Sequence, residues 1–366
     1  MAVRVQQYER RYERQCAAPF ATLLGAANGL RVRRRFASSR MTRGVLRASV
    51  LALGALALAA SASHTLAQAF PSKSLRIIVP YAPGGVVDFV GRTLGQRLSE
   101  QMGQSFVIDN RGGAGGMLGT EVAARAGADG YTLLIMDPAI VINQSLQPKV
   151  PYDVLKDFET ITVATSSPLV LAINPKVPAK TVQDLVGVAK SKPGSLVFAS
   201  AGIGTTPHMA GEFFKARIAQ NIVHVPYKGS GPAMQDLVGG NVQMTFSSIA
   251  AALPFIKEGR LTALATTGAK RVGALPDVPT MIESGFAGFE VELWQAVFVP
   301  AGTPKDTLAR LHSEIIKALQ SAEVRAALAK VGNEPVGSTQ PDAAKFVRAE
   351  LAKWAKLVKD AGIKSE

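Results

Sequence analysis

The stretch LRIIVPYAPGGVVDFVGR, residues 75–92, decides the fold expected for this chain. It begins with a continuous apolar run at 77–79, whose β-branched side chains are typical of a strand buried on both faces. Two prolines end this strand, Gly84 and Gly85 allow a tight turn, and apolar residues then recur at helical spacing. Asp88 stands in the first turn of that helix, where a carboxylate complements the helix dipole.

A strand, a glycine turn and a helix in this order leave the first N–H groups of the helix without backbone partners. Such a helix N-terminus can hold a carboxylate or a phosphate without any Lys or Arg. The same pattern also fits an ordinary connection between a strand and a helix. The stretch therefore predicts an α/β fold, and it leaves anion binding to be decided by the rest of the chain.

A second loop repeats this arrangement further along the chain. Residues 200–207, SAGIGTTP, follow an expected buried strand and precede an expected helix, and their small side chains would let a ligand approach the backbone. Ser200, Thr205 and Thr206 add hydroxyl groups. If the two helix N-termini face one cleft, they could hold a carboxylate between them. The hydroxyl groups could also cap their own helix, and the two roles are compatible.

Strands and helices alternate along the chain in two blocks. The last strands expected in the first block are 161–164 and 169–173. The second block opens at Thr181, which with Asp184 three residues later predicts a helix that starts with a capping box. Strands and helices then alternate again from 196 to 265. Each block predicts an α/β layer with a parallel or mixed sheet.

Two such layers predict two lobes with a cleft between them. We expect lobe 1 to comprise residues 70–172 and 286–366, because amphipathic helices near the C-terminus have apolar stripes that can pack on the first layer. Lobe 2 would comprise residues 173–285. The chain would then cross between the lobes twice, a geometry suited to hinge closure on a ligand.

The composition excludes a nucleic-acid partner. The 366 residues are 47% hydrophobic and 19% charged, which suits a globular protein of about two domains. The net charge of +14 is high, but residues 1–69 contain eleven arginines, no lysine and two acidic residues, so most of the excess lies there. No dense basic run with interleaved aromatic residues follows, so a phosphate-backbone footprint is absent from the sequence.

Residues 41–69 have the three parts of a secretory signal peptide: a basic start, an apolar segment and the small-x-small end Ala67-Gln68-Ala69. We predict cleavage after Ala69 and a periplasmic protein. Residues 1–40 are rich in arginine and precede a signal that is already complete, so we interpret them as a mis-called extension with translation starting at Met41. No later stretch is apolar enough over about 18 residues to predict a membrane span.

Motifs for catalysis and cofactors are weak. The only cysteine, Cys16, lies in the leader, and no pair of histidines has metal-ligand spacing, so we expect no metal. The glycines at 113–119 have the spacing G-x-G-x-x-x-G, which departs from the dinucleotide fingerprint, so we expect no cofactor. Ser200 with His208 could be imagined as a nucleophile and a base. A histidine at a helix N-terminus is more often a hydrogen-bond donor, so the sequence favours a binding protein over an enzyme.

Several motifs in order carry a family resemblance, among them VPYAPGGVVDFVGR, DNRGGAGGMLG, SAGIGTTPHMAGE and VHVPYKGSGPAMQDLVGGNV. Together they resemble the extracytoplasmic solute receptors of tripartite tricarboxylate transporters, the Bug or TctC-like family, over essentially all of residues 70–366. The resemblance implies a type II periplasmic-binding-protein fold in which two α/β lobes, joined by two crossovers, close on a small organic acid. It also implies delivery to the permease subunits of a tripartite tricarboxylate transporter, where one exists.

The resemblance also implies which residues grip the ligand carboxylate, partly through water. They are Tyr81, Gly84, Gly85, Val86, Val87 and Asp88 in the first loop, and Ser200, Gly204, Thr205 and Thr206 in the second, with His208 beside them.

Two departures from the family bear on the ligand. The family has hydroxyl residues where this chain has Val86 and Val87, so only backbone N–H groups remain there. It also tends to have acidic residues where Gln243 and Ser247 stand, which weakens the case for an amino-acid ligand and leaves dicarboxylates or aromatic acids open. Asp88 could cap its own helix, orient a water for a carboxylate, or receive a ligand ammonium group.

The sequence therefore predicts a monomeric, non-enzymatic periplasmic receptor for a small carboxylate. One alternative is a secreted α/β hydrolase or isomerase that uses Ser200 and His208. Another is a receptor that signals through a sensor partner without a transporter.

Overall fold

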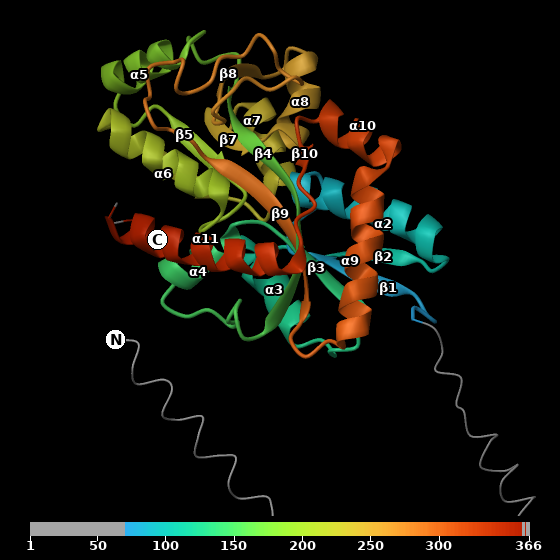
Figure 1. Ribbon diagram of the computed structural model, residues 1–366. Coiled ribbons are helices and arrows are strands. Elements are labelled where there is room, and N and C mark those ends of the chain that lie inside the picture. The colour runs from blue at the N-terminus through green and yellow to red at the C-terminus, as the bar shows by residue number, and fades with distance from the viewer. Residues whose placement is uncertain (1–69, 361–362, 364–366) are drawn as a thin grey trace, which may run out of the picture. The chain divides into compact units, whose positions relative to one another are not determined.

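A computed structural model describes residues 70–360 and 363 of the chain (Figure 1). The expected extension at 1–40, the signal peptide at 41–69 and its cleavage site lie outside these residues.

In the described part of the chain, ten strands form one continuous, mixed sheet. Its order is β2-β1-β3-β9-β4-β7-β5-β6, and β8 and β10 also pair with β4. The strands are β1 (Leu75–Val79), β2 (Phe106–Asn110), β3 (Thr132–Met136), β4 (Phe158–Ile173), β5 (Val197–Ser200), β6 (Val223–Pro226), β7 (Met244–Ser248), β8 (Thr262–Thr266), β9 (Glu292–Pro300) and β10 (Glu334–Pro335).

The long strand β4 belongs to both lobes. Its residues 158–168 pair with β9 in the first lobe, and its residues 169–173 pair with β7 and β8 in the second. The expectation of two separate strands at 161–164 and 169–173 was therefore wrong. Pro168 interrupts the apolar pattern between them, yet it stays in register opposite Glu292 of β9, and the strand continues through it. The chain thus crosses to the second lobe within a single extended strand.

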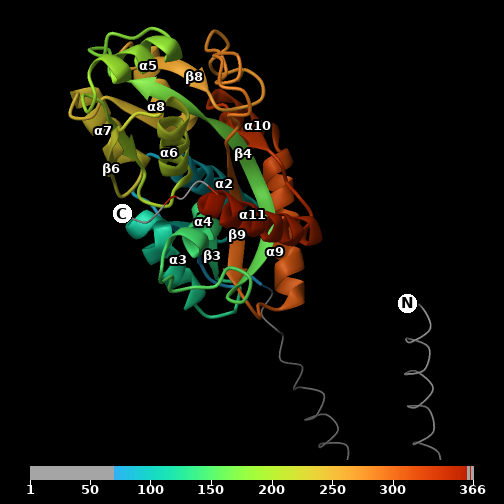
Figure 2. The same ribbon diagram turned by 90° about the vertical axis from the view of Figure 1, so that its left-hand side faces the viewer.

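The helices gather around two groups of strands. In the first lobe they are α2 (Val86–Met102), α3 (Met117–Ala124), α4 (Ala139–Leu146), α9 (Lys305–Gln320), α10 (Ala322–Lys330) and α11 (Gln340–Asp360). In the second lobe they are α5 (Val182–Ser191), α6 (Thr206–Ile218), α7 (Ser230–Gly239) and α8 (Ile249–Lys257). Figure 2, turned by 90°, shows α5 to α8 around β6 and β8, and α3 and α4 beside β3.

The C-terminal helices pack on the first lobe, as the apolar stripes predicted. Helix α9 contacts α2, and α11 contacts α4 and β4. Trp354 of α11 is buried and also stacks on Phe213 of α6, so this helix reaches the second lobe. The predicted capping box is confirmed, because Thr181 and Asp184 exchange their hydrogen bonds at the start of α5.

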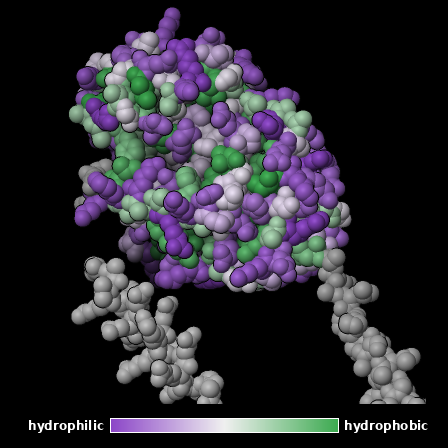
Figure 3. All heavy atoms as spheres, in the orientation of Figure 1, coloured by the Kyte–Doolittle hydropathy of each residue, from purple (hydrophilic) through white to green (hydrophobic). Residues whose placement is uncertain are grey.

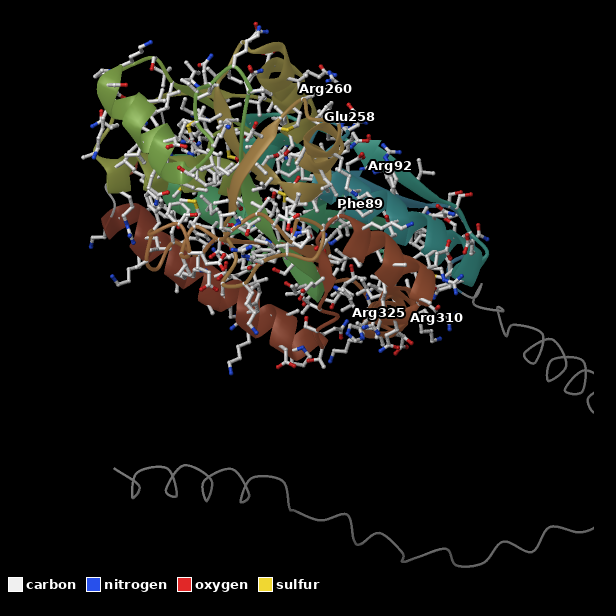
Figure 4. All side chains as sticks on the ribbon, turned by 90° about the horizontal axis from the view of Figure 1, so that it is seen from above. Phe89, Arg92, Glu258, Arg260, Arg310 and Arg325 are labelled. Carbon is white, nitrogen blue, oxygen red and sulfur yellow. The ribbon has the colours of Figure 1, made fainter. Side chains whose placement is uncertain are left out.

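One face of the molecule is mostly polar. On the face shown in Figure 3, hydrophilic side chains dominate and hydrophobic ones form small, separate patches. Figure 4 shows Phe89 and Arg92 of α2 on the same side of the molecule as Glu258 and Arg260, which follow α8.

None of the helices in the described part of the chain is both long and apolar enough to cross a membrane.

Parallel pairing places the functional loops at one edge of each lobe. Strands β1, β2 and β3 are parallel, and so are β5, β6 and β7. The loops that follow β1 and β3 therefore leave from the same edge, as do those that follow β5 and β6. In open α/β sheets this carboxyl edge is where ligands bind.

Candidate functional site

The start of helix α2 is buried in the protein, and no side chain caps it. Its N-cap residue, Gly85, has no side chain to cap with, and Val86 and Val87 are 4% and 3% exposed. Neither the Gly85 N–H nor those of Val86 and Val87 have an acceptor among the described residues. A buried helix end with free N–H groups is costly unless a ligand or water accepts from them.

Asp88 holds the first loop in place. Its carboxylate accepts hydrogen bonds from the Gly84 N–H at 3.2 Å, from Asn110 Nδ2 at 3.0 Å and from Arg92 Nε at 3.1 Å. Burial alone would raise the pKa of Asp88, but the hydrogen bonds from Arg92, Asn110 and Gly84 outweigh it and lower that pKa. Asp88 is therefore ionised and already paired. Of the three roles considered for it, the structure favours stabilising its own loop and helix.

Helix α6 starts in a similar way in the second lobe. Its N-cap residue, Thr205, makes no side-chain cap, because its hydroxyl donates to Gly202 O at 2.6 Å instead. Thr206 is fully buried, and its Oγ1 has no hydrogen-bond partner in the described part of the chain. Pro207 in the first turn is tolerated because its missing N–H would be unpaired there in any case. The start of α6 thus also contains a polar group, the Thr206 hydroxyl, that has no hydrogen-bond partner in the described part of the chain.

The hydroxyl of Ser200 is bonded to its own loop and to the neighbouring strand β6. Ser200 Oγ lies 2.7 Å from Nε2 of His224 and accepts from the Gly202 N–H at 3.1 Å. Gly204 N–H donates to His208 Nδ1 at 3.3 Å. The pairing imagined between Ser200 and His208 is replaced by one between Ser200 and His224. These contacts shape the second loop.

A small cavity of about 20 Å³ lies between the two helix starts. Tyr81, Gly85, Val86, Val87 and Asp88 line it from the first loop and α2, and Asp137, Ala201, Pro207, Ser230 and Leu293 complete the lining. A cavity of this size has room for about one water molecule. Six residues predicted as ligand contacts do not line the cavity. Gly84, Gly204 and Thr205 lie in the loops, Ser200 ends β5, and Thr206 and His208 lie in the first turn of α6. The structure brings the two predicted loops together at one cavity.

The lobes meet through backbone around this cavity. Ala82 N–H donates to Lys228 O at 2.9 Å across the lobes. The approach is so close that a Cβ at Gly231 would clash with Pro83 O, and one at Gly115 would clash with Ile203 O. Only glycine permits such contact between main chains. The structure therefore has the two lobes in contact, with a partly open cavity between them.

Sequence reasoning missed two groups at the cavity. Ser230 begins α7, a third helix that starts without a side-chain cap, and the signal for it was the glycine-rich segment 229–231 after an expected strand. Asp137 follows β3 directly, and the signal for it was a charged residue at the carboxyl end of a buried strand. Helix α4, which begins just after Asp137, was also missed because its apolar run is short.

Asp137 is a buried acid without a counter-ion. Its side chain is 4% exposed, and its Oδ1 accepts from Tyr81 Oη at 2.8 Å and from the Ala139 N–H at 3.0 Å. Burial raises the pKa of Asp137 to about 6. No Lys, Arg or His of the described residues is among the groups that shift this pKa. The same part of the chain contains no cluster of acidic and imidazole groups suited to a metal ion.

Comparison with known proteins identifies the family. Residues 90–363 match the family model described as the tripartite tricarboxylate transporter family receptor. The chain belongs to this receptor family. The protein BugT of Bordetella pertussis is 38% identical over 311 residues, which cover 84% of this chain and 95% of BugT.

Solved receptor structures share the fold. The periplasmic binding protein BugD is 32% identical with a TM-score of 0.79, over 81% of this chain and 100% of BugD. A protein from R. palustris, Rpa4515 with adipate, is 36% identical with a TM-score of 0.78, over 81% of this chain and 99% of that one. The fold is therefore the type II periplasmic-binding-protein fold expected from the sequence, and this receptor is a periplasmic solute-binding protein and not an enzyme.

Proposed function

We propose that this receptor captures a small organic carboxylate between the first turns of α2 and α6. The observation that carries the proposal is the set of buried, unpaired N–H groups of Gly85, Val86 and Val87 at a cavity that no Lys or Arg of the described residues lines. Backbone N–H groups and the positive ends of helix dipoles favour an anion without any cationic side chain. The valine side chains add apolar contacts for the body of the ligand.

In this proposal, some of the ligand residues predicted from the sequence contact the ligand and the others position the second loop. In this proposal the first turn of α2 contacts the carboxylate directly, and the hydroxyl of Thr206, which has no partner among the described residues, is a further candidate donor. Ser200, Gly204, Thr205 and His208 position the second loop. The similarity to a protein solved with adipate supports a dicarboxylate among the candidates.

We also propose that the receptor acts as a monomer and delivers its ligand to the permease subunits of a tripartite tricarboxylate transporter, in line with the family model. Export would involve cleavage after Ala69, which N-terminal sequencing of the exported protein would test.

A thermal-shift screen tests the ligand class. Purified protein is heated with succinate, adipate, malate, citrate, benzoate, glutamate and, as neutral probes, glucose and glycerol. A ligand that binds only the folded state stabilises it by RT ln(1 + [L]/Kd), which is about 2.7 kcal/mol at 100 times Kd. We expect at least one carboxylate to raise Tm and the neutral probes to leave it unchanged. A response to the neutral probes alone would contradict the proposal.

The variant Val86→Pro tests the N–H groups themselves. Val86 is the first residue of α2, where proline is well tolerated, so the variant removes one unpaired N–H with little effect on the helix. Charge-assisted hydrogen bonds are each worth about 1.5–3 kcal/mol, so we expect carboxylate affinity to fall about 10- to 100-fold.

The matched control is Ala322→Pro, which changes the first residue of α10 outside the cavity. Calorimetric titration should show normal affinity for this variant. Equal affinity in Val86→Pro and the wild type would refute binding at the start of α2.

A further inference from the structure

The buried acid Asp137 presents an acceptor to the cavity. Its Oδ1 accepts from Tyr81 and from the Ala139 N–H, and its carboxylate also accepts from the N–H of Asp137 itself, whereas no hydrogen bond from another described residue reaches Oδ2. Asp137 lines the cavity together with Tyr81 and the start of α2. The site that favours an anion at its helix ends therefore also contains an acid without a counter-ion.

Tyr81 cannot offset this, because its single hydroxyl hydrogen is already donated to Asp137. Burial, and next the charge of Asp137, raise the pKa of Tyr81, so its hydroxyl stays protonated. What Tyr81 has left for a ligand is a lone pair. Both side chains thus offer acceptors to the cavity.

On the basis of the proposed function, we propose that Asp137 determines which second polar group the ligand carries. The part of the cavity that Asp137 lines accepts a hydrogen-bond donor. It accepts a bare carboxylate only when Asp137 Oδ2 carries a proton. A ligand hydroxyl or ammonium group donates to Oδ2 directly. A second ligand carboxylate, in contrast, is repelled by the lone pair and the negative charge of the Asp137 carboxylate. It binds only when Oδ2 is protonated and donates a hydrogen bond to it.

Among the described residues that line the cavity, no other group supplies that proton or a counter-charge. Tyr81 and Tyr152 face it in the first lobe, and both stay neutral because burial raises the pKa of each. Asp88 lines the same cavity, and its charge is balanced by Arg92 at 3.0 Å. The cavity residues of the second lobe, Ala201, Pro207 and Ser230, do not titrate in this range. Asp137 has a pKa of about 6, so it is the group that changes charge near neutral pH.

The test measures the affinity of the wild type for succinate and adipate by calorimetric titration from pH 5.5 to pH 8. We expect affinity to fall as the pH rises above 6, approaching tenfold for each pH unit, with uptake of about one proton on binding, as measured in two buffers of different ionisation enthalpy. The variant Asp137→Asn places an N–H donor in the position of a lone pair. We expect it to bind both probes at pH 8 more tightly than the wild type does, with no uptake of a proton.

Two controls separate Asp137 from other causes. Titration of the probes themselves would appear equally in the wild type and in Asp137→Asn. Asp277→Asn makes the same chemical change at an exposed position away from the cavity, and it should behave as the wild type. Asparagine is as good as aspartate at the start of a helix, so the beginning of α4 is retained in Asp137→Asn.

The outcomes distinguish this inference from the proposed function. If the wild type binds a dicarboxylate equally from pH 5.5 to pH 8 and Asp137→Asn changes nothing, the inference is overturned and the carboxylate receptor stands. If no carboxylate binds at any pH, the proposed function is overturned as well.

Discussion

His224 contacts the second loop, with its Nε2 2.7 Å from Ser200 Oγ and its ring stacked on Phe198 at 4.5 Å between centroids. Burial, and next the charge of Lys215, lower the pKa of His224 to about 4. The imidazole is therefore neutral in the folded protein at neutral pH. In the unfolded chain its pKa is close to 6.5, so acid favours the unfolded state through this residue.

The residue-scale prediction concerns stability in acid. Because the folded state binds fewer protons at His224, its contribution is complete above pH 6.5 and is lost as the pH falls from 6.5 to 4, by up to about 3 kcal/mol. The variant His224→Gln lacks this loss, so its Tm should fall less than that of the wild type between pH 7 and pH 4.5. Asp137 acts in the opposite direction, since burial raises its pKa, so the variants must be compared with the wild type at each pH. Parallel curves for the two proteins would contradict the prediction.

At the scale of elements, the glycine-rich loops do more than free the starts of helices. The loops after β1 and β6 meet main chain to main chain, through the bond from Ala82 N–H to Lys228 O and the approach of Gly231 to Pro83. Gly231 lies in the first turn of α7 and does not need a left-handed backbone, so its lack of a side chain serves the contact between the lobes. Contact of this kind is available only when the lobes are together.

We expect Gly231→Ala to impair closure and leave folding intact. The added Cβ would clash with Pro83 O only when the lobes meet, and alanine is otherwise favourable in a helix. Affinity for the carboxylate found by screening should fall at least tenfold, with the Tm of the ligand-free protein unchanged or higher. Gly239→Ala at the end of the same helix adds a Cβ with no close neighbour and should bind normally. Normal binding by Gly231→Ala would show that the closed contact is not needed.

At the scale of the whole molecule, α11 connects β9 with the second lobe. Glu350 Oε2 accepts from Trp294 Nε1 of β9 at 2.9 Å and from Trp354 Nε1 of α11 at 3.1 Å. Trp354 in turn stacks on Phe213 of the second lobe. The last helix thus connects β9 with both lobes, and the buried carboxylate of Glu350 accepts a hydrogen bond from each of the two indole groups.

The variant Glu350→Ala should therefore destabilise the fold. It leaves two buried indole N–H groups without an acceptor, at about 1–3 kcal/mol each. We expect a clear fall in Tm, together with a change in tryptophan fluorescence, since the sequence has only two tryptophans and both bond to this residue. Glu100→Ala, an exposed change on α2, should leave both signals as in the wild type. An unchanged Tm in Glu350→Ala would show that Glu350 does not stabilise the connection between β9 and α11.

The sequence by itself determined the local structure of this protein: the strand, glycine turn and helix at 75–102, the capping box at Thr181, and the second loop at 200–207. These features depend on neighbours in the chain, through side-chain periodicity, backbone freedom and capping, which a sequence displays directly. The two blocks of alternating strands and helices added the two lobes, and the family motifs added the class of receptor.

Only the tertiary structure decided what lies across the cleft. It paired Ser200 with His224 instead of His208, ran β4 through Pro168, and placed Asp137 without a counter-ion at the cavity. Each of these depends on residues far apart in sequence meeting at the carboxyl edges of two sheets. The burial and the hydrogen-bond partners that fix their chemistry arise only when those edges come together.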